Sequence, residues 1–443
     1  MLSERIRAMI RDYNSWWECI DINVPVYQRH VLSRVRTFME SKQIIALTGL
    51  RRVGKTTIMK QLITELKVQK NNIFYFLFDD LIAQNSDVLI ELLDYYLKTI
   101  AKDGKKYIFL DEVQKIPYWQ DIIKRYYDTR DDVKFVVSGS ASLNIKKSKE
   151  SLAGRLFDIY ITPLSFREFL ELNDVNIGKI SIEKLSEHFE QNIHKKAIMN
   201  EMLRKYILRG AFPEIAKEEK LEFVHQYIRS SVIEKMIYED ISLVFKIKRR
   251  DVLMALFEYC SKETSNLLDL TNLGKLFSVN YLTIRSYLFY LKSSFVIDIA
   301  PNYSGSILKQ LRKNKKIHIV HPSISLALMK YKEAVLDVDE ITGRFIETIV
   351  FQHARCMGER IFFWRTPQKE EVDILVEINN EFIPIEVKFR NNISNSDTKI
   401  LLKFMERKNI RHGFLITKDL FAEKELSGRH ITFVPAWLFL LVV

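Results

Sequence analysis

The stretch from Gln43 to Thr57, QIIALTGLRRVGKTT, constrains the fold of this chain more than any other. Four apolar residues, 44–47, predict a buried strand that runs directly into the pattern G-x-x-x-x-G-K-T. Apolar residues at helical spacing follow between Ile58 and Leu66, so the pattern is expected to connect a strand to a helix. This is the context of a phosphate-binding loop, where backbone N–H groups and the start of a helix surround phosphate oxygens.

The residues of this loop have separate expected roles. Gly49 and Gly54 allow the backbone to turn its N–H groups inward. Lys55 would bring a cation to the outer phosphates, and the Thr56 hydroxyl would ligate Mg²⁺. An accidental match is disfavoured because the chain has only 13 glycines. We therefore predict ATP and Mg²⁺ as cofactors, with the nucleotide bound by Gly49, Leu50, Arg51, Arg52, Val53, Gly54, Lys55, Thr56 and Thr57.

A second buried strand, residues 107–110, ends in two carboxylates, Asp111 and Glu112. Asp111 is expected to hold the Mg²⁺ ion, and Glu112 to polarise the attacking water. An aromatic-rich strand, residues 72–78, separates the two motifs along the chain. The motifs in this order predict an ATPase.

Two further positions are candidates for contact with the phosphates. A strand that starts at Phe135 ends in Ser138-Gly-Ser140, and either serine could sense the γ-phosphate through a hydrogen bond; an ordinary turn is an equal alternative. Arg155 could stabilise the charge that develops during phosphoryl transfer, either in its own chain or from a neighbouring subunit. The second arrangement would require a homo-oligomer.

Several segments together resemble one protein family: GLRRVGKTT, YIFLDE, VVSGSAS and SLAGRLFDIYITPLSFREFLE. They are similar to the bacterial and archaeal AAA-superfamily ATPases that carry a second domain at the C-terminus. YILRGAFPE, residues 206–214, resembles that family's GGFPE signature, with Ala211 in place of the second glycine. The resemblance extends over nearly the whole chain. It implies a RecA-like sheet with an added strand, Arg155 as an arginine finger and Ser138 as a sensor.

The formal net charge of +12 is unevenly distributed. Residues 275–316 contain eight lysines and arginines and a single acid, Asp298. Such a tract predicts a polyanionic partner, which we interpret as DNA; a solvated basic face is the alternative. Residues 270–277 and 281–291 predict two helices joined by a tight turn, and two strands follow, as in a winged helix. Its exposed face would present Asn280, Thr283, Arg285 and Ser286 to a major groove, unless the module joins proteins instead.

The C-terminal segment predicts the order helix, three strands, helix, strand. Strand alternation places Glu386 and Lys388 on one face, and Asp373 on the preceding strand can meet them. With Glu347 from the preceding helix, the two acids would hold Mg²⁺ while Lys388 orients or deprotonates a water. This order and these residues resemble the PD-(D/E)xK nuclease superfamily. The same fold used for binding without cleavage is the alternative.

The length of 443 residues and the 47% of apolar residues predict several packed domains. Three distant cysteines, Cys19, Cys260 and Cys356, favour reduced thiols and a cytoplasmic location. The apolar end, residues 431–443, is too short to span a bilayer, so no membrane association is expected. We expect an α/β protein with a helical lead-in (1–40), an AAA-type P-loop ATPase core (41–162), a helical connector (163–225), a winged-helix domain (226–335) and a nuclease-like domain (336–443).

Two functions compete on these grounds. The first is an ATP-hydrolysing, DNA-associated protein with a Mg²⁺-dependent nuclease domain. The second is an ATP-dependent regulatory switch whose C-terminal domain binds DNA or a partner without cutting.

Overall fold

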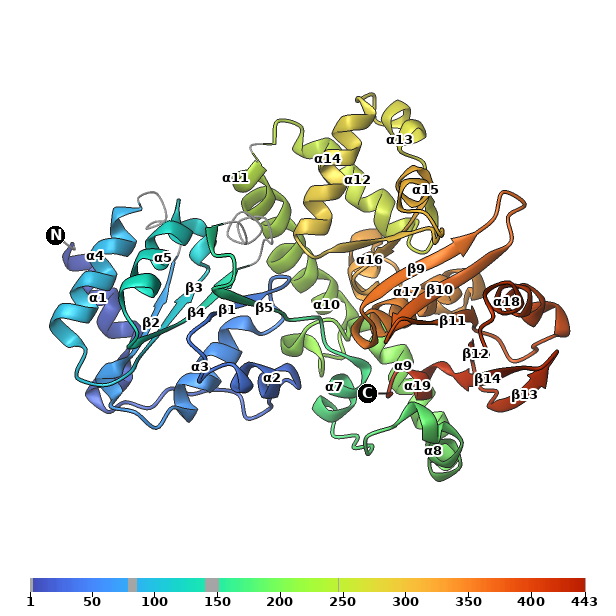
Figure 1. The fold of residues 1–443 in the computed structure, drawn as a ribbon, viewed down its shortest axis with the longest axis horizontal. Coiled ribbons are helices and arrows are strands. Elements are labelled where there is room, and N and C mark those ends of the chain that lie inside the picture. Colours follow the sequence, from blue (N-terminus) through green and yellow to red (C-terminus); the bar gives the residue numbers. More distant parts are fainter. Residues whose placement is uncertain (1–2, 79–85, 140–150, 246, 443) are drawn as a thin grey trace. The chain divides into compact units, whose positions relative to one another are not determined.

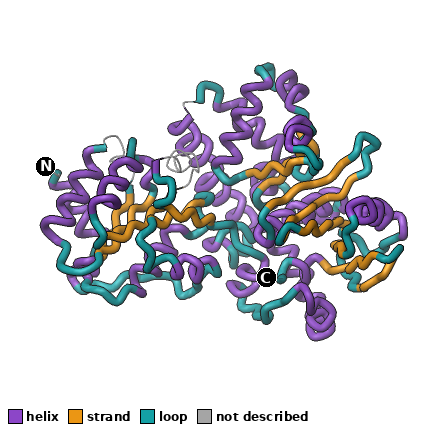
Figure 2. The backbone as a smooth tube through the Cα atoms, in the orientation of Figure 1, coloured by secondary structure: helices purple, strands orange, loops and turns teal. Residues whose placement is uncertain are grey.

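The computed structural model describes residues 3–78, 86–139, 151–245 and 247–442. The chain folds into two compact units, which are described separately. The first comprises Met1–Thr162 with Ser293–Phe295, and the second comprises Pro163–Lys292 with Val296–Val443. In both units, strands gather in sheets and helices pack against them (Figure 2). Among the described residues, no helix is both long enough and apolar enough to cross a bilayer.

The first unit is built on a five-stranded parallel sheet with the order β2-β3-β4-β1-β5 (Figure 1). β4 lies between β1 and β3, which confirms the predicted RecA-like sheet with an added strand. The strands are almost continuously apolar because both faces of the sheet are covered. Their bounds are β1 (Ile44–Thr48), β2 (Ile73–Leu77), β3 (Lys106–Asp111), β4 (Val133–Gly139) and β5 (Leu156–Tyr160).

Successive side chains of each strand point to opposite faces of the sheet, and helices pack against these side chains. Phe74 and Phe76 of β2 point into a core shared with α1, α4 and α5. Asn14, which follows α1, brackets β2: its amide donates to the Tyr75 carbonyl at 2.9 Å and accepts from the Tyr75 N–H at 2.7 Å. The helices of this unit are α1 (Glu4–Tyr13), α2 (Val31–Thr37), α3 (Lys55–Glu65), α4 (Asp87–Tyr95) and α5 (Trp119–Thr129).

The second unit begins with a helical region. Ser165 and Glu168 form a reciprocal capping box that starts the first of its helices, because each side chain accepts from the other residue's N–H. The predicted helix over residues 224–240 is present as α10 and two π-helical stretches, Ile228–Glu234 and Met236–Ile241. The α-helices here are α7 (Phe166–Leu172), α8 (Leu185–Asn192), α9 (Lys196–Arg209), α10 (Leu221–Tyr227) and α11 (Ser242–Phe245).

A helix–turn–helix module, residues 250–319, follows. The Asp269 carboxylate accepts from two N–H groups at the start of α13, so it fixes where this helix begins. The predicted strand pair is present, and a short third strand completes an antiparallel sheet of order β6-β8-β7. The elements are α12 (Arg250–Lys262), β6 (Leu267–Leu268), α13 (Leu270–Leu276), α14 (Tyr281–Ser293), β7 (Ile297–Pro301), α15 (Ile307–Arg312) and β8 (Lys315–Ile319). α16 (Pro322–Met329) comes next.

The C-terminal part of the second unit is a six-stranded mixed sheet of order β13-β14-β12-β11-β10-β9. The predicted order helix, three strands, helix, strand is present, and β13 and β14 extend it. One apolar core packs α17 and α19 on one face of the sheet, and another packs α18 on the opposite face. The elements are α17 (Asp339–Met357), β9 (Arg360–Arg365), β10 (Glu371–Ile378), β11 (Glu381–Lys388), α18 (Asn395–Lys408), β12 (His412–Thr417), β13 (Ala422–Leu426), β14 (Arg429–Pro435) and α19 (Ala436–Phe439).

The two edge strands of this sheet, β9 and β13, have different surroundings on their outer sides. Residues following β7 run beside β9: Tyr303 N–H donates to the Phe363 carbonyl at 2.7 Å, and the Asn302 amide bonds both backbone groups of Arg365. At the other edge, the middle residues of β13, Glu-Lys-Glu at 423–425, are exposed.

Candidate functional sites

The loop after β1 has the backbone that its glycines require. Gly49 has φ +150°, and a Cβ there would lie 2.3 Å from the Ile161 carbonyl oxygen, so a larger residue would clash. Gly54, with φ +100°, immediately precedes α3. Both conformations favour glycine. The loop therefore turns tightly between β1 and the N-terminus of α3, as predicted.

Lys55 lies inside this loop and is only 5% exposed. Its ammonium donates to the Gly49 carbonyl at 3.0 Å and to the Leu50 carbonyl at 2.9 Å. Of the remaining predicted loop residues, Leu50 and Val53 are buried, Arg51, Thr56 and Thr57 are half-buried, and Arg52 is exposed.

Two residues outside the motif hold the loop, and the sequence did not predict them. The Arg29 guanidinium donates to the Val53 carbonyl at 2.6 Å and to the Thr162 carbonyl at 2.9 Å. Gln61 of α3 donates to the carbonyls of Pro25 and Tyr27 at 2.9 and 2.8 Å. The segment before α2 is thereby attached to the loop and its helix. No local pattern marks these residues, because their partners are backbone carbonyls distant in sequence.

Asp111, at the end of β3, is fully buried, and its partners are three hydroxyl groups. Thr56 and Tyr75 donate to Oδ2 at 2.6 and 2.9 Å, and Ser138 donates to Oδ1. Burial raises the pKa of Asp111 and the Glu112 charge adds to this, while the three hydroxyls oppose it. The structure thus brings together Thr56, Asp111 and Ser138, and adds Tyr75, which the aromatic pattern of β2 did not single out.

Glu112 follows Asp111 in a left-handed conformation, with φ 53°. Its N–H donates to the Ser138 hydroxyl at 3.1 Å, and its carboxylate accepts from the Gln114 amide at 2.5 Å. Ser138 therefore connects both acids of the motif. The alternative sensor, Ser140, lies outside the described residues.

Arg155 precedes β5, at the end of the parallel strands opposite to the end that carries the phosphate-binding loop. β5 is parallel to β1, and the Arg155 carbonyl accepts from the Ile44 N–H at the start of β1, whereas the loop follows the end of β1. At about 3.3 Å per strand residue, the length of β1 places roughly 13 Å between Arg155 and the start of the loop. The guanidinium binds the Asp128 carboxylate of α5, with atoms at 2.8 and 3.3 Å. This position does not bring Arg155 beside the loop of its own chain.

The predicted acids and lysine of the C-terminal sheet do come together. Lys388 Nζ lies 2.5 Å from Glu386 Oε1, two residues back on β11. Asp373 Oδ2 accepts from the Val387 N–H at 3.0 Å. A register shift between Val372 and Leu375 interrupts the pairing of β10 with β9 and includes Asp373. Such irregularities re-aim side chains at the end of a strand.

A third predicted ligand, Glu347 of α17, reaches this group through Lys316 of β8, which belongs to the basic tract 275–316. Lys316 Nζ lies 2.8 Å from Glu347, 2.6 Å from Glu371 and 3.5 Å from Asp373. Burial lowers the pKa of Lys316, but the three acids outweigh it and raise the pKa above its ordinary value. We call Lys316, Glu347, Glu371, Asp373, Glu386 and Lys388 the carboxylate cluster.

Lys316 and Glu386 of the cluster are buried and the other members are half-buried, with consequences for its acids. Burial raises the pKa of Glu347 to about 8, against the opposing charge of Lys316. Burial and then the charge of Asp373 raise the pKa of Glu386 to about 8, with Lys388 opposing. Oxygens that a divalent ion would need already accept from ammonium groups. Among the described residues, no group of three or more His, Cys, Asp or Glu side chains is arranged to hold a metal ion. The cluster as arranged does not fit Mg²⁺.

The helix–turn–helix module exposes part of its basic tract. Lys275 of α13, Arg285 of α14 and Lys309 of α15 are exposed, whereas Lys316 is not. Asn280, predicted to face a groove, accepts from the Leu282 N–H at 2.9 Å at the start of α14, while Thr283 and Ser286 are half-buried. Large apolar side chains, including Leu276, Tyr281 and Leu282, are exposed on the same helices.

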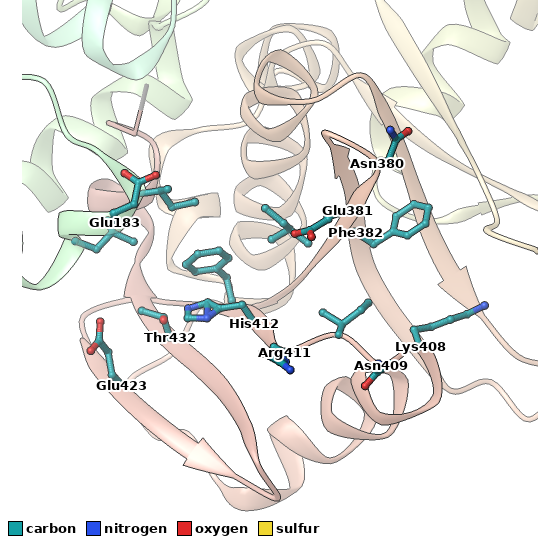
Figure 3. Close-up of a pocket in the computed structure, with 15 residues that line it drawn as sticks. Glu183, Asn380, Glu381, Phe382, Lys408, Asn409, Arg411, His412, Glu423 and Thr432 are labelled. Carbon is teal, nitrogen blue, oxygen red and sulfur yellow. The ribbon is translucent and has the colours of Figure 1, made fainter.

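A pocket of about 760 Å³ opens in the second unit (Figure 3). Its lining includes the start of β11 at Glu381, the start of β12 at His412 and the end of α18 at Lys408. Glu386 and Lys388 instead lie at the far end of β11. Among the described residues, none of the predicted site residues lines this pocket.

Three segments of the chain match known protein families. Residues 41–170 match a family described as "AAA domain". Residues 200–335 and 342–439 match two families described as domains of unknown function, DUF8612 and DUF4143. The first unit therefore contains an AAA-type P-loop domain.

Relatives resemble the chain over most of its length. A protein of Methanocaldococcus jannaschii is 27% identical over 91% of this chain and 86% of its own length. A second protein of that organism is 26% identical over 98% of this chain and 96% of its own. A Haemophilus influenzae protein is 23% identical over 93% and 98%. All three are named as uncharacterized proteins.

Proposed function

We propose that the first unit hydrolyses ATP. The observation that carries this proposal is the convergence of the Thr56 and Ser138 hydroxyls on Asp111, next to Glu112 and at the edge of the sheet that carries the phosphate-binding loop. An adjacent hydroxyl and carboxylate are hard oxygen ligands, so Thr56 and Asp111 fit Mg²⁺ and would hold it. When bound, this ion would neutralise charge on the β- and γ-phosphates.

The chain's own residues divide the remaining work. Lys55 and the N-terminus of α3 would bind the phosphates, and the Glu112 carboxylate would accept a proton from the attacking water. Ser138, which donates to Asp111 and accepts from the Glu112 N–H, would position both acids and could sense the γ-phosphate.

Steady-state ATPase assays of the full chain test this proposal. Lys55→Ala and Glu112→Gln should each lower kcat by on the order of 100-fold, since each removes a group that stabilises or generates the transition state. Lys67→Ala, an exposed lysine just after α3, is the control and should retain activity. Glu112→Gln should still bind ATP, whereas Lys55→Ala should bind it weakly. Unchanged turnover in Glu112→Gln would contradict the proposal.

We further propose that Arg155 acts on the nucleotide of a neighbouring subunit. Its place at the end of the strands opposite its own loop supports action between chains, and its side chain, although paired with Asp128, is 32% exposed. Arginine fingers supplied in this way are worth on the order of 10³ in kcat.

Mixed assemblies separate this role from a structural one. Lys55→Ala and Arg155→Ala should each be inactive alone, but their mixture should regain activity because some sites then combine an intact Lys55 with a neighbour's intact Arg155. Arg155→Lys should not substitute, since a point charge lacks the planar fork. A mixture that co-assembles and stays inactive would refute action in trans.

A second candidate function is nucleic-acid binding by the helix–turn–helix module. The observation that favours it is the exposure of Lys275, Arg285 and Lys309 on α13, α14 and α15. Contacts from such side chains to phosphates would be sequence-tolerant and strongly salt-dependent.

Fluorescence anisotropy with duplex DNA at several salt concentrations tests this function. A triple alanine variant of Lys275, Arg285 and Lys309 should bind more weakly and lose about 0.9 of salt slope for each phosphate contact removed. The matched control is a triple alanine variant of Lys330, Lys399 and Lys418, exposed lysines of the same unit. Equal losses in both triples would mean that only net charge matters and would contradict a binding face.

For the C-terminal sheet, the contacts of its acids with Lys316 and Lys388 favour the regulatory alternative over the nuclease. We therefore propose an ATP-driven switch whose second unit binds nucleic acid without cutting it. Incubation with supercoiled DNA, Mg²⁺ and ATP should leave the DNA intact. Cleavage that disappears in Lys388→Ala would restore the nuclease hypothesis.

A further inference from the structure

Lys316 lies in the central strand of the three-stranded sheet, β6-β8-β7, and its side chain is only 2% exposed. Burying a charged ammonium is costly unless partners satisfy both its charge and its N–H donors. Lys316 has three N–H donors, and the three carboxylates of Glu347, Glu371 and Asp373 lie within 3.5 Å of Nζ. The structure thus places one cation at the focus of three acids.

Three further oxygens of the cluster also accept hydrogen bonds. Glu386 accepts from Lys388, and the second oxygen of Glu371 accepts from the Arg365 guanidinium. Asp373 Oδ2 accepts from a backbone N–H. The four acids of the cluster therefore face three cationic side chains: Lys316 and Lys388 within the cluster, and Arg365 beside it.

We propose that the Lys316 ammonium is the resident cation of the carboxylate cluster and excludes a divalent metal ion from it. Mg²⁺ requires oxygens at 2.0–2.1 Å in octahedral geometry. An ammonium bound at 2.6 and 2.8 Å by two of the same carboxylates occupies that position, and both cations cannot share it. The acids that resemble nuclease ligands are here committed to a lysine from another part of the chain.

Contacts along β8 and α17 keep this lysine in place. His318, two residues on from Lys316, stacks on Phe351, four residues on from Glu347, with ring centroids 3.9 Å apart. The hydroxyls of Thr264 and Thr348 are 2.8 Å apart, so the module is also attached to α17 beside Glu347. These contacts hold the backbone of Lys316 beside the acids.

The cluster consequently joins the helix–turn–helix module to the C-terminal sheet. Lys316 belongs to the module, whereas its three partners belong to α17 and β10. This inference goes beyond the proposed function: it concerns metal binding and attachment, and its failure would leave the ATPase proposal intact.

Metal binding to the wild-type protein gives the first test. Bound Mn²⁺ per chain would be counted by equilibrium dialysis without nucleotide, for wild type and for Asp373→Asn. We expect the same count for both, because the cluster takes no metal. One ion more in wild type than in Asp373→Asn would overturn the proposal.

Removal of the lysine gives the second test. Lys316→Met keeps the side chain's length but removes its charge, and it should gain one Mn²⁺ per chain and a higher Tm in Mn²⁺. Lys316→Met/Asp373→Asn should lose the gained ion, and Lys399→Met, an exposed lysine of the same unit, should gain none. A folded Lys316→Met that gains no ion would overturn the proposal. If that variant folds only in Mn²⁺, the proposal is supported; if it does not fold at all, the wild-type count decides.

Discussion

Asp111 at the end of β3 and Asp373 near the start of β10 each lie close to a second acid, Glu112 and Glu386, yet their surroundings differ. Asp111 accepts from three neutral hydroxyls, of Thr56, Tyr75 and Ser138. Asp373 belongs to a group that includes two ammonium ions, Lys316 and Lys388. Hydroxyls orient a carboxylate and leave its charge uncompensated, so it can receive a cation. Ammonium groups compensate the charge.

The type of hydrogen-bond donor around buried acids decides whether these acids are available as metal ligands. Both sites contain acids at spacings typical of metal-dependent phosphate chemistry. Only the first surrounds its acid with neutral partners.

The largest effect should follow from removing the cation of the second site. Lys316→Met leaves buried acids uncompensated, so the free energy of unfolding in metal-free buffer should fall by about 3–5 kcal/mol. Chemical denaturation followed by circular dichroism would measure it. Lys399→Met should change the free energy by less than about 0.5 kcal/mol. ATP turnover should persist at temperatures where the variant is folded, and a fully stable variant would show that the acids do not depend on Lys316.

Removing the charge of Asp111 should lower ATP turnover without lowering stability, the opposite of the result expected for Lys316→Met. Asp111→Asn should lower kcat for ATP by on the order of 100-fold or more, because the charge that holds Mg²⁺ is lost. Its Tm should be equal to or above that of wild type, since a buried and uncompensated charge is removed. Calorimetry beside the ATPase assay tests both. A strongly destabilised variant would mean that Asp111, like Asp373, is compensated in the fold.

A smaller effect should follow from deleting one hydroxyl donor. Tyr75→Phe removes the 2.9 Å hydrogen bond to Asp111 while keeping the ring in β2. Hydrogen bonds to charged groups are worth about 1.5–3 kcal/mol, so the Mg²⁺ concentration for half-maximal ATPase activity should rise at least about tenfold. Tyr118→Phe, on an exposed residue, is the control. An unchanged Mg²⁺ dependence would show that Tyr75 only fills space.

The smallest effect concerns Lys134, a second buried lysine that can be compared with Lys316. Lys134 of β4 is buried like Lys316, but it donates to neutral carbonyls, those of Phe38, Ser41 and Gln43. Burial lowers the pKa of Lys134 to about 7, compared with an ordinary value of 10.5. Between these pH values the unfolded chain binds more protons, so this contribution to stability rises from pH 7 towards 10.5 and is lost as pH falls to 7.

Lys134→Met isolates this contribution. The difference in unfolding free energy between wild type and variant should shift in favour of wild type by about 1 kcal/mol per pH unit between pH 7.5 and 8.5. Denaturant titrations at the two pH values would measure it. A difference independent of pH would mean that Lys134 stays charged, as Lys316 does.

The first site was predictable because its parts are local motifs at one edge of a parallel sheet. Thr56 and Asp111 each follow a recognisable strand, and strand order then brings them together. Tyr75 and Arg29 escaped prediction because their partners depend on packing between segments distant in sequence. The role of Arg155 was implied by the family resemblance, but its place at the far end of the strands follows only from the parallel pairing of β5 with β1.

The second site was half predictable for a related reason. Strand alternation placed Glu386 and Lys388 together, and the order of strands added Asp373. Lys316 stands in the run Lys-Asn-Lys-Lys, which has the composition of a solvated surface. Its burial follows from β8 pairing on both sides, with β6 and with β7, and this pairing has no local signature.

The two edge strands of the C-terminal sheet, β9 and β13, are protected against aggregation. Exposed strand edges invite a strand from another chain, and with it aggregation. Here the backbone of β9 is already engaged by residues 302 and 303, and β13 presents alternating charges that oppose a flat apolar contact. Recruitment by strand addition is thereby disfavoured at both ends. A partner of this sheet would therefore recognise side chains rather than backbone groups, so the sheet can bind selectively without promoting aggregation.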